Sequence, residues 1–278
     1  MPRPNPPPKM SDDFSQVAEA FSRKAHLYDL FGMGHENLTR MRQKVYAQVM
    51  GFLEPGDKIL ELNAGTGTDA LFFARQGYHV HATDLSPGMV QKIRKKSHAT
   101  GTGGRLSVAQ ISFTRLNHVE GGPYQHIYSN FGGLNCIPEL RNVTQHIPGL
   151  LEPGKTLTWV IMPRVTPWDW RAALKGDWRT ALRRLGANGA RANVEGVEFQ
   201  TYYFSPKIVM RALGPDFKMV HLQGLSLFAP PADNDVFATR HASIYKILVG
   251  MDEIVSHLPI LAGWGDFFIL SARYLPTT

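Results

Sequence analysis

Short apolar runs alternate with amphipathic segments along most of the chain, and each pattern predicts a different element. Five apolar runs are bounded by turn residues and are short enough for buried β-strands: Lys58–Leu62, Tyr78–Thr83, Leu106–Ser112, Gln125–Ser129 and Thr156–Met162. Segments with apolar residues at helical spacing separate them. Strands that alternate with helices in this way predict a parallel, doubly wound α/β sheet.

The same patterns predict the rest of the framework. Two more strands, at residues 217–228 and Phe267–Tyr274, would bring a mostly parallel sheet to seven strands. Helices are expected from apolar periodicity, proline at helix starts and glycine at helix ends. They cover residues 13–30, 36–52, 68–76, a segment that begins at Ser86-Pro87, and residues 139–151, 205–213 and 239–257.

The regular alternation breaks at residues 163–204. This stretch contains Trp168, Trp170 and Trp178, with two short helices predicted, and passes through glycine-rich sequence to Val197–Phe204. We interpret it as a cap inserted over the carboxyl ends of the strands, because open α/β sheets bind ligands at that edge.

The rest of the chain shows no internal repeat and no clear linker. Residues 13–278 are therefore predicted to form a single domain, with a helical lid at residues 13–52. Residues 1–12 are rich in proline and predict a disordered tail. The tail lacks the apolar core of a secretory signal.

Composition excludes several classes of protein. The chain has 278 residues and no apolar run of membrane-spanning length. Cys136 is its only cysteine, which rules out an internal disulfide and a cysteine-based zinc site and fits a cytoplasmic location. The eleven histidines include no HExxH spacing, so no metal site is predicted. The net charge of +7 is compatible with nucleic acid, but the basic residues are scattered.

A glycine-containing turn follows the first strand. Gly65 and Gly67 allow a tight turn and close approach of a ligand, and the next helix offers free backbone N–H groups at its start. Residues 65–70 satisfy the pattern GxGxxA. Proteins that bind NAD and proteins that bind S-adenosylmethionine both have this pattern, so the turn alone does not distinguish them.

Two acidic residues favour S-adenosylmethionine. Glu61, at the end of the first strand, would repel a pyrophosphate but would attract the amino-acid part or the sulfonium region of S-adenosylmethionine. Asp84, at the end of the second strand, can accept hydrogen bonds from both ribose hydroxyls. Leu85 and Met89 can then form an apolar wall for the adenine.

Taken in order, these motifs resemble those of class I S-adenosylmethionine-dependent methyltransferases of the small-molecule type. Ile59–Met89 resembles their motifs I and II, YQHIYSNFGGLNCIPEL their fourth strand and loop, and LLEPGKTLTWVIMPR their LkPGG turn and fifth strand. FSRKAHLYD resembles the helix that closes over the cofactor. The resemblance covers roughly residues 14–162. It implies a Rossmann-like fold with S-adenosylmethionine as cofactor and S-adenosylhomocysteine as product.

The resemblance also has departures. Asn63 stands where the family has the first glycine of E/DxGxGxG, and Ser112, followed by Phe113, stands where an acidic residue often lies near the adenine amino group. Carried over by position, the expected cofactor-binding residues are Tyr28, Glu61, Asn63, Gly65, Thr66, Gly67, Asp84, Leu85, Met89, Ser112, Phe113, Asn130 and Phe131.

Catalytic and substrate residues are less clearly marked, because methyl transfer depends on positioning and needs a general base only when the acceptor must lose a proton. Asn130 and Asn135, after the fourth strand, are candidates for a catalytic role, and loop capping is the alternative. Candidate substrate-binding residues are Tyr28, Trp168, Tyr202 and Tyr203. The aromatic residues of the cap could instead pin it to the sheet.

The sequence therefore predicts a methyltransferase that acts on an O, N or C nucleophile of a small, aromatic or apolar molecule. The basic charge leaves an RNA or protein methyltransferase as an alternative, and GxGxxA leaves a nicotinamide-dependent oxidoreductase. A non-catalytic protein that binds the cofactor also stays open. The accepting atom, the substrate and the oligomeric state are not determined.

Overall fold

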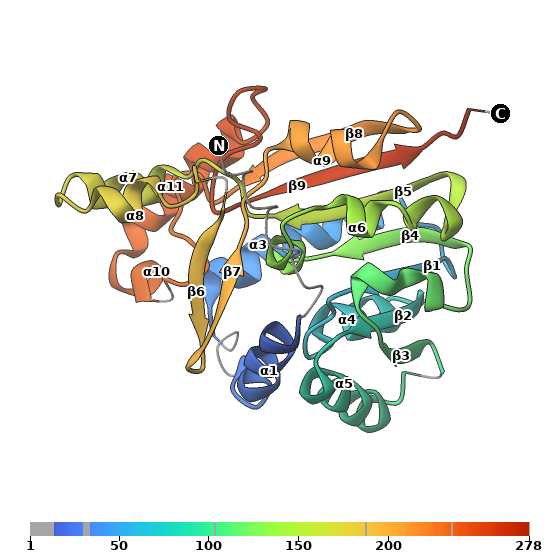
Figure 1. Cartoon of the computed structure of the whole chain (residues 1–278). Helices are drawn as coiled ribbons and strands as arrows, with labels where there is room; N and C mark the ends of the chain where they lie inside the picture. Colours follow the sequence, from blue (N-terminus) through green and yellow to red (C-terminus); the bar gives the residue numbers. More distant parts are fainter. Residues whose placement is uncertain (1–13, 30–33, 103, 187, 235, 278) are drawn as a thin grey trace, which may run out of the picture.

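A computed structural model describes residues 14–29, 34–102, 104–186, 188–234 and 236–277 (Figure 1). The tail expected at residues 1–12 lies outside the described residues. A sheet of seven strands has the order β3-β2-β1-β4-β5-β9-β8. Its strands are β1 (Lys58–Leu62), β2 (His79–Asp84), β3 (Leu106–Gln110), β4 (Tyr124–Ser129), β5 (Leu151–Ile161), β8 (Phe217–Leu225) and β9 (Phe267–Tyr274).

The predicted doubly wound, mostly parallel sheet is confirmed. Strands β1 to β5 pair in parallel, while β9 runs antiparallel to both β5 and β8. Successive residues of β1 face opposite sides of the sheet, so Ile59 joins one apolar core and Leu60 the other. Both side chains are fully buried. Cover on both faces explains why the strands read as continuous apolar runs.

Helices cover both faces of the sheet (Figure 1). The α-helices of the sheet framework are α1 (Ser15–Lys24), α3 (Glu36–Met50), α4 (Thr68–Arg75), α5 (Pro87–Thr100), α6 (Arg141–Thr144), α9 (Pro206–Leu213), α10 (Val236–Arg240) and α11 (Ala242–Val255). Helices α3, α4 and α5 contribute to the core on the Ile59 face, while α6 and α9 contribute to the core on the Leu60 face. None of the helices in the described part of the chain is long and apolar enough to cross a bilayer.

Several boundaries differ from the sequence predictions, and three of these differences change an element. The helix predicted at residues 139–151 is wrong: α6 has four residues, a 3-10 turn η3 (Ile147–Gly149) follows, and β5 already begins at Leu151. Pro148 in that turn cannot donate a helical hydrogen bond. The helix predicted at 239–257 is divided at His241, whose φ of −129° and ψ of 49° are not helical. The third strand ends before Ser112, which instead caps the 3-10 helix η1 (Phe113–His118).

Residues 163–204 contain two short helices, as expected, and a β-hairpin. The helices are α7 (Pro167–Ala173) and α8 (Trp178–Leu182), and the hairpin pairs β6 (Ala190–Val194) with β7 (Val197–Thr201). Helix α1 lies between this hairpin and α5 (Figure 1). Phe21 of α1 contacts Phe199 of β7 at 5.9 Å between ring centroids.

Glycine lets α1 approach α5 closely. A Cβ at Gly88 would lie 3.0 Å from the Cα of Ser22, so any other residue would push the two helices apart. The hydroxyls of Ser22 and Ser86 are hydrogen bonded at 2.8 Å. The first helix is therefore held at the beginning of α5, beside the end of β2.

Candidate functional site

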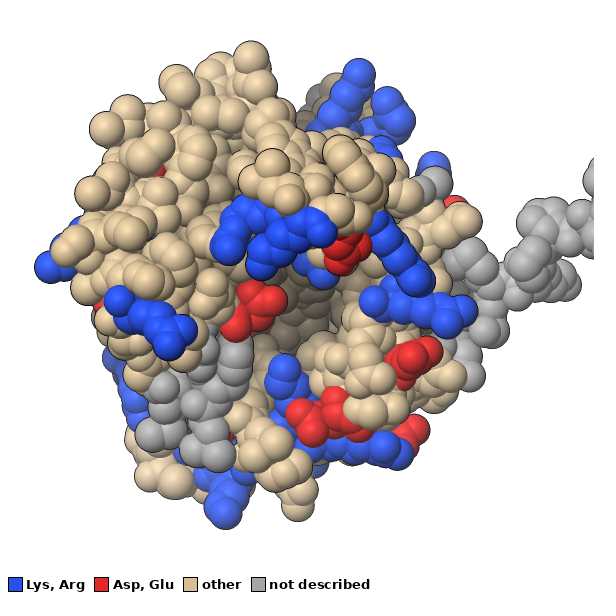
Figure 2. All heavy atoms as spheres, turned by 90° about the vertical axis from the view of Figure 1, so that its left-hand side faces the viewer, with Lys and Arg blue, Asp and Glu red and all other residues tan. Residues whose placement is uncertain are grey.

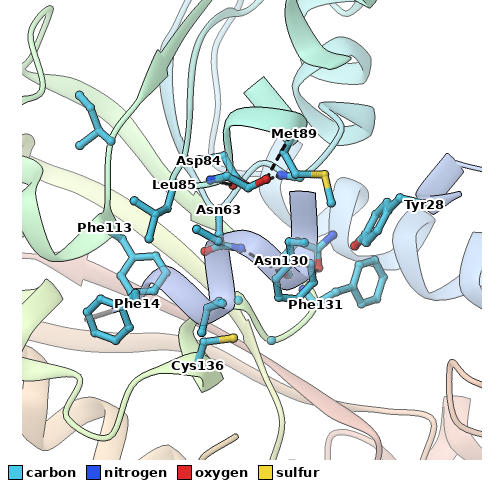
Figure 3. Close-up of a pocket in the computed structure, with 18 residues that line it drawn as sticks. Phe14, Tyr28, Asn63, Asp84, Leu85, Met89, Phe113, Asn130, Phe131 and Cys136 are labelled. Carbon is cyan, nitrogen blue, oxygen red and sulfur yellow. Dashed lines mark hydrogen bonds between the residues drawn. The ribbon is translucent and has the colours of Figure 1, made fainter. Parts of the chain in front are cut away.

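A pocket opens at the carboxyl ends of β1, β2 and β4 (Figure 3). Helix α1 covers it with one apolar face, formed by Phe14, Val17, Ala18 and Phe21. The sheet side and its loops contribute Asn63, Gly65, Asp84, Leu85, Ser86, Met89, Ile111, Phe113, Asn130, Phe131, Gly132, Gly133 and Cys136, and Tyr28 lies at one end. Parallel strands place these loops together because their carboxyl ends share one edge of the sheet.

The enclosed space of about 110 Å³ continues beside a larger cleft of about 560 Å³. The two spaces share Phe14, Ala18, Leu85 and Ile111 as walls. Together they fall within the range of roughly 300–1,000 Å³ that is typical of small-molecule sites. Figure 2 shows a hollow on the side of the molecule that carries α7, α8 and α10, with both basic and acidic side chains around it.

The glycine turn and Asp84 are joined directly. Gly65 N donates to Asp84 Oδ2 at 2.8 Å, and Ser86 N donates to Oδ1 at 2.9 Å. Burial raises the pKa of Asp84 to about 6, although its backbone hydrogen bonds act in the opposite direction. Gly65 has a φ of 57°, in the left-handed region that glycine adopts without strain. The turn therefore holds the carboxylate of Asp84, a buried hydrogen-bond acceptor, at the wall of the pocket.

Asn63 connects the turn to the loop after β4. Ser129 Oγ donates to Asn63 Oδ1 at 2.8 Å, and Asn63 Nδ2 donates to the carbonyl of Asn130 at 3.3 Å. A Cβ at Gly133 would lie 2.1 Å from Asn63 Nδ2, so any other residue there would displace the Asn63 side chain. The asparagine that departs from the family pattern thus fills space left by a glycine in a different loop.

Asp69, in the first turn of α4, organises a buried polar cluster under the pocket. Its carboxylate accepts from Tyr46 Oη at 2.6 Å and from Asn130 Nδ2 at 2.7 Å, and pairs with Arg42 Nε at 2.7 Å. Tyr128 Oη donates at 3.2 Å. Asp69 was missed by sequence reasoning, which treated it as a variable position of GxGxxA. Its place after the glycine turn was the available signal.

The amide of Asn130 is held in one orientation by this cluster. Its Nδ2 donates to Asp69, and its Oδ1 accepts from Phe131 N at 2.9 Å. Arg42 also lies over the Phe131 ring, with 5.1 Å from its guanidinium carbon to the centroid. The side chain of Asn130 lines the pocket but is largely engaged with the protein.

Glu61 lies at the end of β1 with an unsatisfied atom. Its Oε2 is buried and has no hydrogen-bond partner within the described residues. Burial, reinforced by the nearby carboxylate of Asp69, raises its pKa well above the usual value, while Arg42 acts in the opposite direction. Glu61 is not among the described residues that line the pocket. An unpaired buried polar atom is costly, so a ligand that supplied the missing hydrogen-bond partner would stabilise it.

Aromatic and apolar side chains form the two ends of the pocket (Figure 3). Phe14, Phe113 and Leu85 lie at one end, and Tyr28, Phe131 and Met89 lie at the other. The Phe14 and Phe113 rings contact each other at 6.4 Å between centroids. The contribution of Phe14 and Phe21 was not predicted, although the helical spacing of their apolar neighbours indicated a face that had to be buried.

The structure places several other candidate residues outside the pocket. Thr66 donates to Asp29 at 2.6 Å, and a Cβ at Gly67 would lie 2.9 Å from Ile93, which makes Gly67 a site of close helix packing. Ser112 lines the neighbouring cleft. Asn135 is buried and donates to the carbonyls of Met162 and Tyr202 at 3.1 and 2.6 Å, which is the geometry of loop capping.

The aromatic residues proposed for the substrate have other contacts. Trp168 Nε1 donates to the Phe228 carbonyl at 3.1 Å, and its ring packs on Phe237. Tyr202 packs against the core on the Leu60 face, and Tyr203 stacks on Arg184. None of these three side chains is among the described residues that line the pocket. Only Tyr28 of that set lies in it.

Sequence comparison connects this site to known proteins. A family model described as a methyltransferase domain matches residues 59–154. The demethylmenaquinone methyltransferase of Beutenbergia cavernae is 29% identical over 204 residues, which are 70% of this chain and 77% of that protein. The family model and this relative support a class I S-adenosylmethionine-dependent methyltransferase. For seven further curated methyltransferases of the same name, the chain spans between 54% and 60% of their length.

Solved structures of methyltransferases share the fold. The CcbJ methyltransferase from Streptomyces caelestis matches with a TM-score of 0.59 and 15% identity over 92% of this chain and 98% of that one. The 1,6-didemethyltoxoflavin-N1-methyltransferase of Burkholderia thailandensis, whose structure contains S-adenosylhomocysteine, matches with a TM-score of 0.56 and 16% identity over 94% and 88%. The cofactor of the family is S-adenosylmethionine, and the comparisons do not favour a nicotinamide-dependent oxidoreductase.

Proposed function

We propose that this methyltransferase acts on an oxygen, nitrogen or carbon nucleophile of a small molecule that is aromatic or apolar. The observation that carries the proposal is the composition of the pocket. The buried acceptor Asp84 lies between two ends made of apolar and aromatic side chains, and α1 covers the space from outside. A pocket of this kind favours a ligand with few polar groups and fixes its orientation at a few points.

The relatives support the same class of acceptor. The curated sequences are named for demethylmenaquinone, and the solved structure from Burkholderia thailandensis is named for a didemethyltoxoflavin. Both names describe small molecules. An RNA or protein substrate is not favoured, because the comparisons match methyltransferases of small molecules and the pocket is covered by α1.

The residues around the pocket fit the cofactor of the family. Asp84 would accept from the ribose hydroxyls, and Leu85 with Phe113 would bound the adenine. Glu61, whose Oε2 has no hydrogen-bond partner in the described protein, would pair with the cationic amino-acid end, whose charge would favour the ionised carboxylate. When bound, S-adenosylmethionine supplies an activated methyl group and its own leaving group.

The protein's own contribution is positioning and exclusion of water. Among the described side chains that line the pocket, Tyr28, Asp84 and Cys136 can titrate. Burial raises the pKa of Cys136 to about 12 and raises that of Tyr28 above its ordinary value, so both stay protonated at neutral pH. His126 is buried away from the pocket and its pKa is lowered to about 3.

This set of groups constrains the acceptor. No described lining residue is a strong base once Asp84 is committed to the ribose, so the acceptor should need little help in losing a proton. Acidic phenols, hydroquinones, activated carbon acids and neutral amines meet that condition. Tyr28 and Asn130 would orient the acceptor, and the rate would come from proximity.

Two measurements test the proposal. Calorimetry with S-adenosylmethionine, S-adenosylhomocysteine and NADH should show binding of the first two, and binding of NADH alone would contradict it. Release of S-adenosylhomocysteine is then measured with a hydroquinone, a phenol, an apolar amine, transfer RNA and a basic protein as acceptors. Turnover with RNA or protein but with none of the small molecules would overturn the proposed acceptor class.

A further inference from the structure

Helix α11 carries an apolar face that points away from the protein. Its buried residues, Tyr245 and Asp252, lie on the inner side. On the outer side, Ile247 is 64% exposed and Ile254 is 77% exposed, and Ile244 and Met251 continue the same row at helical spacing. Leu258 and Ile260 in the following turn are exposed as well. An amphipathic helix normally buries such a row.

Helices α7 and α8 add exposed apolar side chains on the same side of the molecule (Figure 1). Leu174 is 88% exposed, and Trp170, Trp178 and Leu182 are also exposed. Trp170 contacts Trp264, in the turn after α11, at 5.8 Å between ring centroids. We call the surface made by α7, α8, α11 and residues 258–264 the outer face.

Cations border the outer face. Arg171, Lys175 and Arg179 on α7 and α8 are exposed, as is Lys246 on α11. The exposed acids on these helices are Asp177, which caps α8, and Glu253, which pairs with Lys44 of α3. The whole chain has a net charge of +7. Exposed tryptophan and aliphatic side chains beside lysine and arginine are the pattern of a segment that lies in the interface of a lipid bilayer.

We propose that the outer face binds the surface of an anionic lipid bilayer. Its charge argues for this occupant over a second copy of the chain, because a symmetric dimer would bring the cations of α7 and α8 toward those of the partner. Anionic headgroups would attract the cations, and the apolar side chains would enter the boundary with the acyl chains. No described helix spans a bilayer, so the binding is peripheral.

The position of the outer face points to a role for binding to the bilayer. Helices α7, α8, α10 and α11 lie on the side of the molecule that is hollowed in Figure 2. An apolar acceptor dissolved in a bilayer could then approach the protein from the side on which it is adsorbed. The lipid-binding inference does not depend on the proposed acceptor, because its test measures association with vesicles and not methyl transfer.

The test uses the full chain and vesicles of mixed phosphatidylcholine and phosphatidylglycerol, with pure phosphatidylcholine as the uncharged comparison. Co-sedimentation should show binding to the anionic vesicles that weakens as salt is raised. Ile247→Glu with Ile254→Glu should reduce binding by at least about tenfold, because two apolar groups are lost and two negative charges are added. Replacing Arg171, Lys175 and Arg179 by glutamine should weaken binding only to anionic vesicles.

Leu275→Glu is the matched control. Leu275 is 48% exposed and directly follows β9, whose C-terminal end lies on the opposite side of the molecule from α7, α8 and α11 in Figure 1. It should leave vesicle binding unchanged, and unchanged affinity for S-adenosylhomocysteine would show that every variant is folded. Absence of binding to anionic vesicles, or equal loss in the control, overturns the proposal. A dimer in light scattering that the α11 variant dissociates, without capture by vesicles, would instead assign the outer face to contact between copies.

Discussion

Asn63 occupies the space into which a side chain at Gly133 would project. The calculated position of a Cβ at Gly133 is 2.1 Å from Asn63 Nδ2 and 2.2 Å from its Cγ. The two residues belong to loops after different strands, β1 and β4, which are neighbours in the sheet. Asn63 has a φ of 47°, a conformation that asparagine tolerates better than most residues and that glycine adopts freely.

The contact between these two residues predicts that a substitution at Asn63 restores stability lost by a substitution at Gly133. Gly133→Ala should destabilise the protein by about 1–3 kcal/mol, as expected when a buried site is overpacked. Adding Asn63→Gly should recover much of that loss, because it removes the clashing side chain at a φ that glycine accepts. Chemical denaturation of the two single variants and the double variant measures the coupling. Additive effects of the two changes would contradict the packing relationship.

Asp84 predicts a pH dependence of cofactor binding. Its pKa of about 6 lies above the value of about 3.9 in an unfolded chain. The protonated carboxyl is therefore favoured in the fold, so this group stabilises the protein below about pH 4, and the contribution is lost as pH rises through 6. Acceptance from ribose hydroxyls has the opposite dependence, because it needs the carboxylate.

Affinity for S-adenosylhomocysteine should accordingly fall by up to about tenfold between pH 7 and pH 5, where about a tenth of Asp84 is ionised. Calorimetry at several pH values measures it. Asp84→Asn should bind more weakly at pH 7 and lose most of this dependence, and Asp84→Ala should weaken binding at least about tenfold. Any dependence that persists in Asp84→Asn would be assigned to Glu61, whose pKa is also raised.

The Arg42–Asp69 pair predicts a large loss of stability when one partner is removed. The side chains are 18% and 7% exposed and meet at 2.7 Å. Asp69→Asn should cost about 3–5 kcal/mol, because Arg42 would be left charged and buried without a carboxylate. Arg42→Met combined with Asp69→Asn should cost less than the sum of the single changes. Denaturation of all four proteins decides this, and a zero coupling energy would show that the pair acts independently.

Substitutions of Trp168 and Phe113 should differ in their effects on ligand binding. Trp168 contacts Phe237 and the Phe228 carbonyl and does not line the pocket, whereas Phe113 does. Trp168→Ala should lower the melting temperature yet change affinity for S-adenosylhomocysteine by less than about twofold. Phe113→Ala should weaken the same affinity by at least about tenfold through lost apolar contact. Thermal denaturation and calorimetry separate the two effects. A larger loss of affinity in Trp168→Ala than in Phe113→Ala would show that Trp168 contributes to the binding site.

Local sequence determined most of the framework of this protein. The bounds of β1 and β9 agree with their apolar runs, because both strands are buried on both faces and read continuously. The turn at Gly65 and the strand end at Asp84 were also predicted, because a tight turn and a strand end are local features of the sequence. The prediction of a helix at residues 139–151 was wrong because pairing with β4 extends β5 back to Leu151.

Only the tertiary structure decided which side chains meet across distant segments. Asp69 with Arg42 and Asn130, Asn63 with Gly133, and α1 with the pocket all depend on how strands and helices pack, and no local pattern specifies those contacts. The same holds for the outer face, since periodicity shows that α11 is amphipathic but not which of its sides the fold covers. Sequence thus determined the edge of the sheet at which the pocket lies, and packing determined which distant residues surround it.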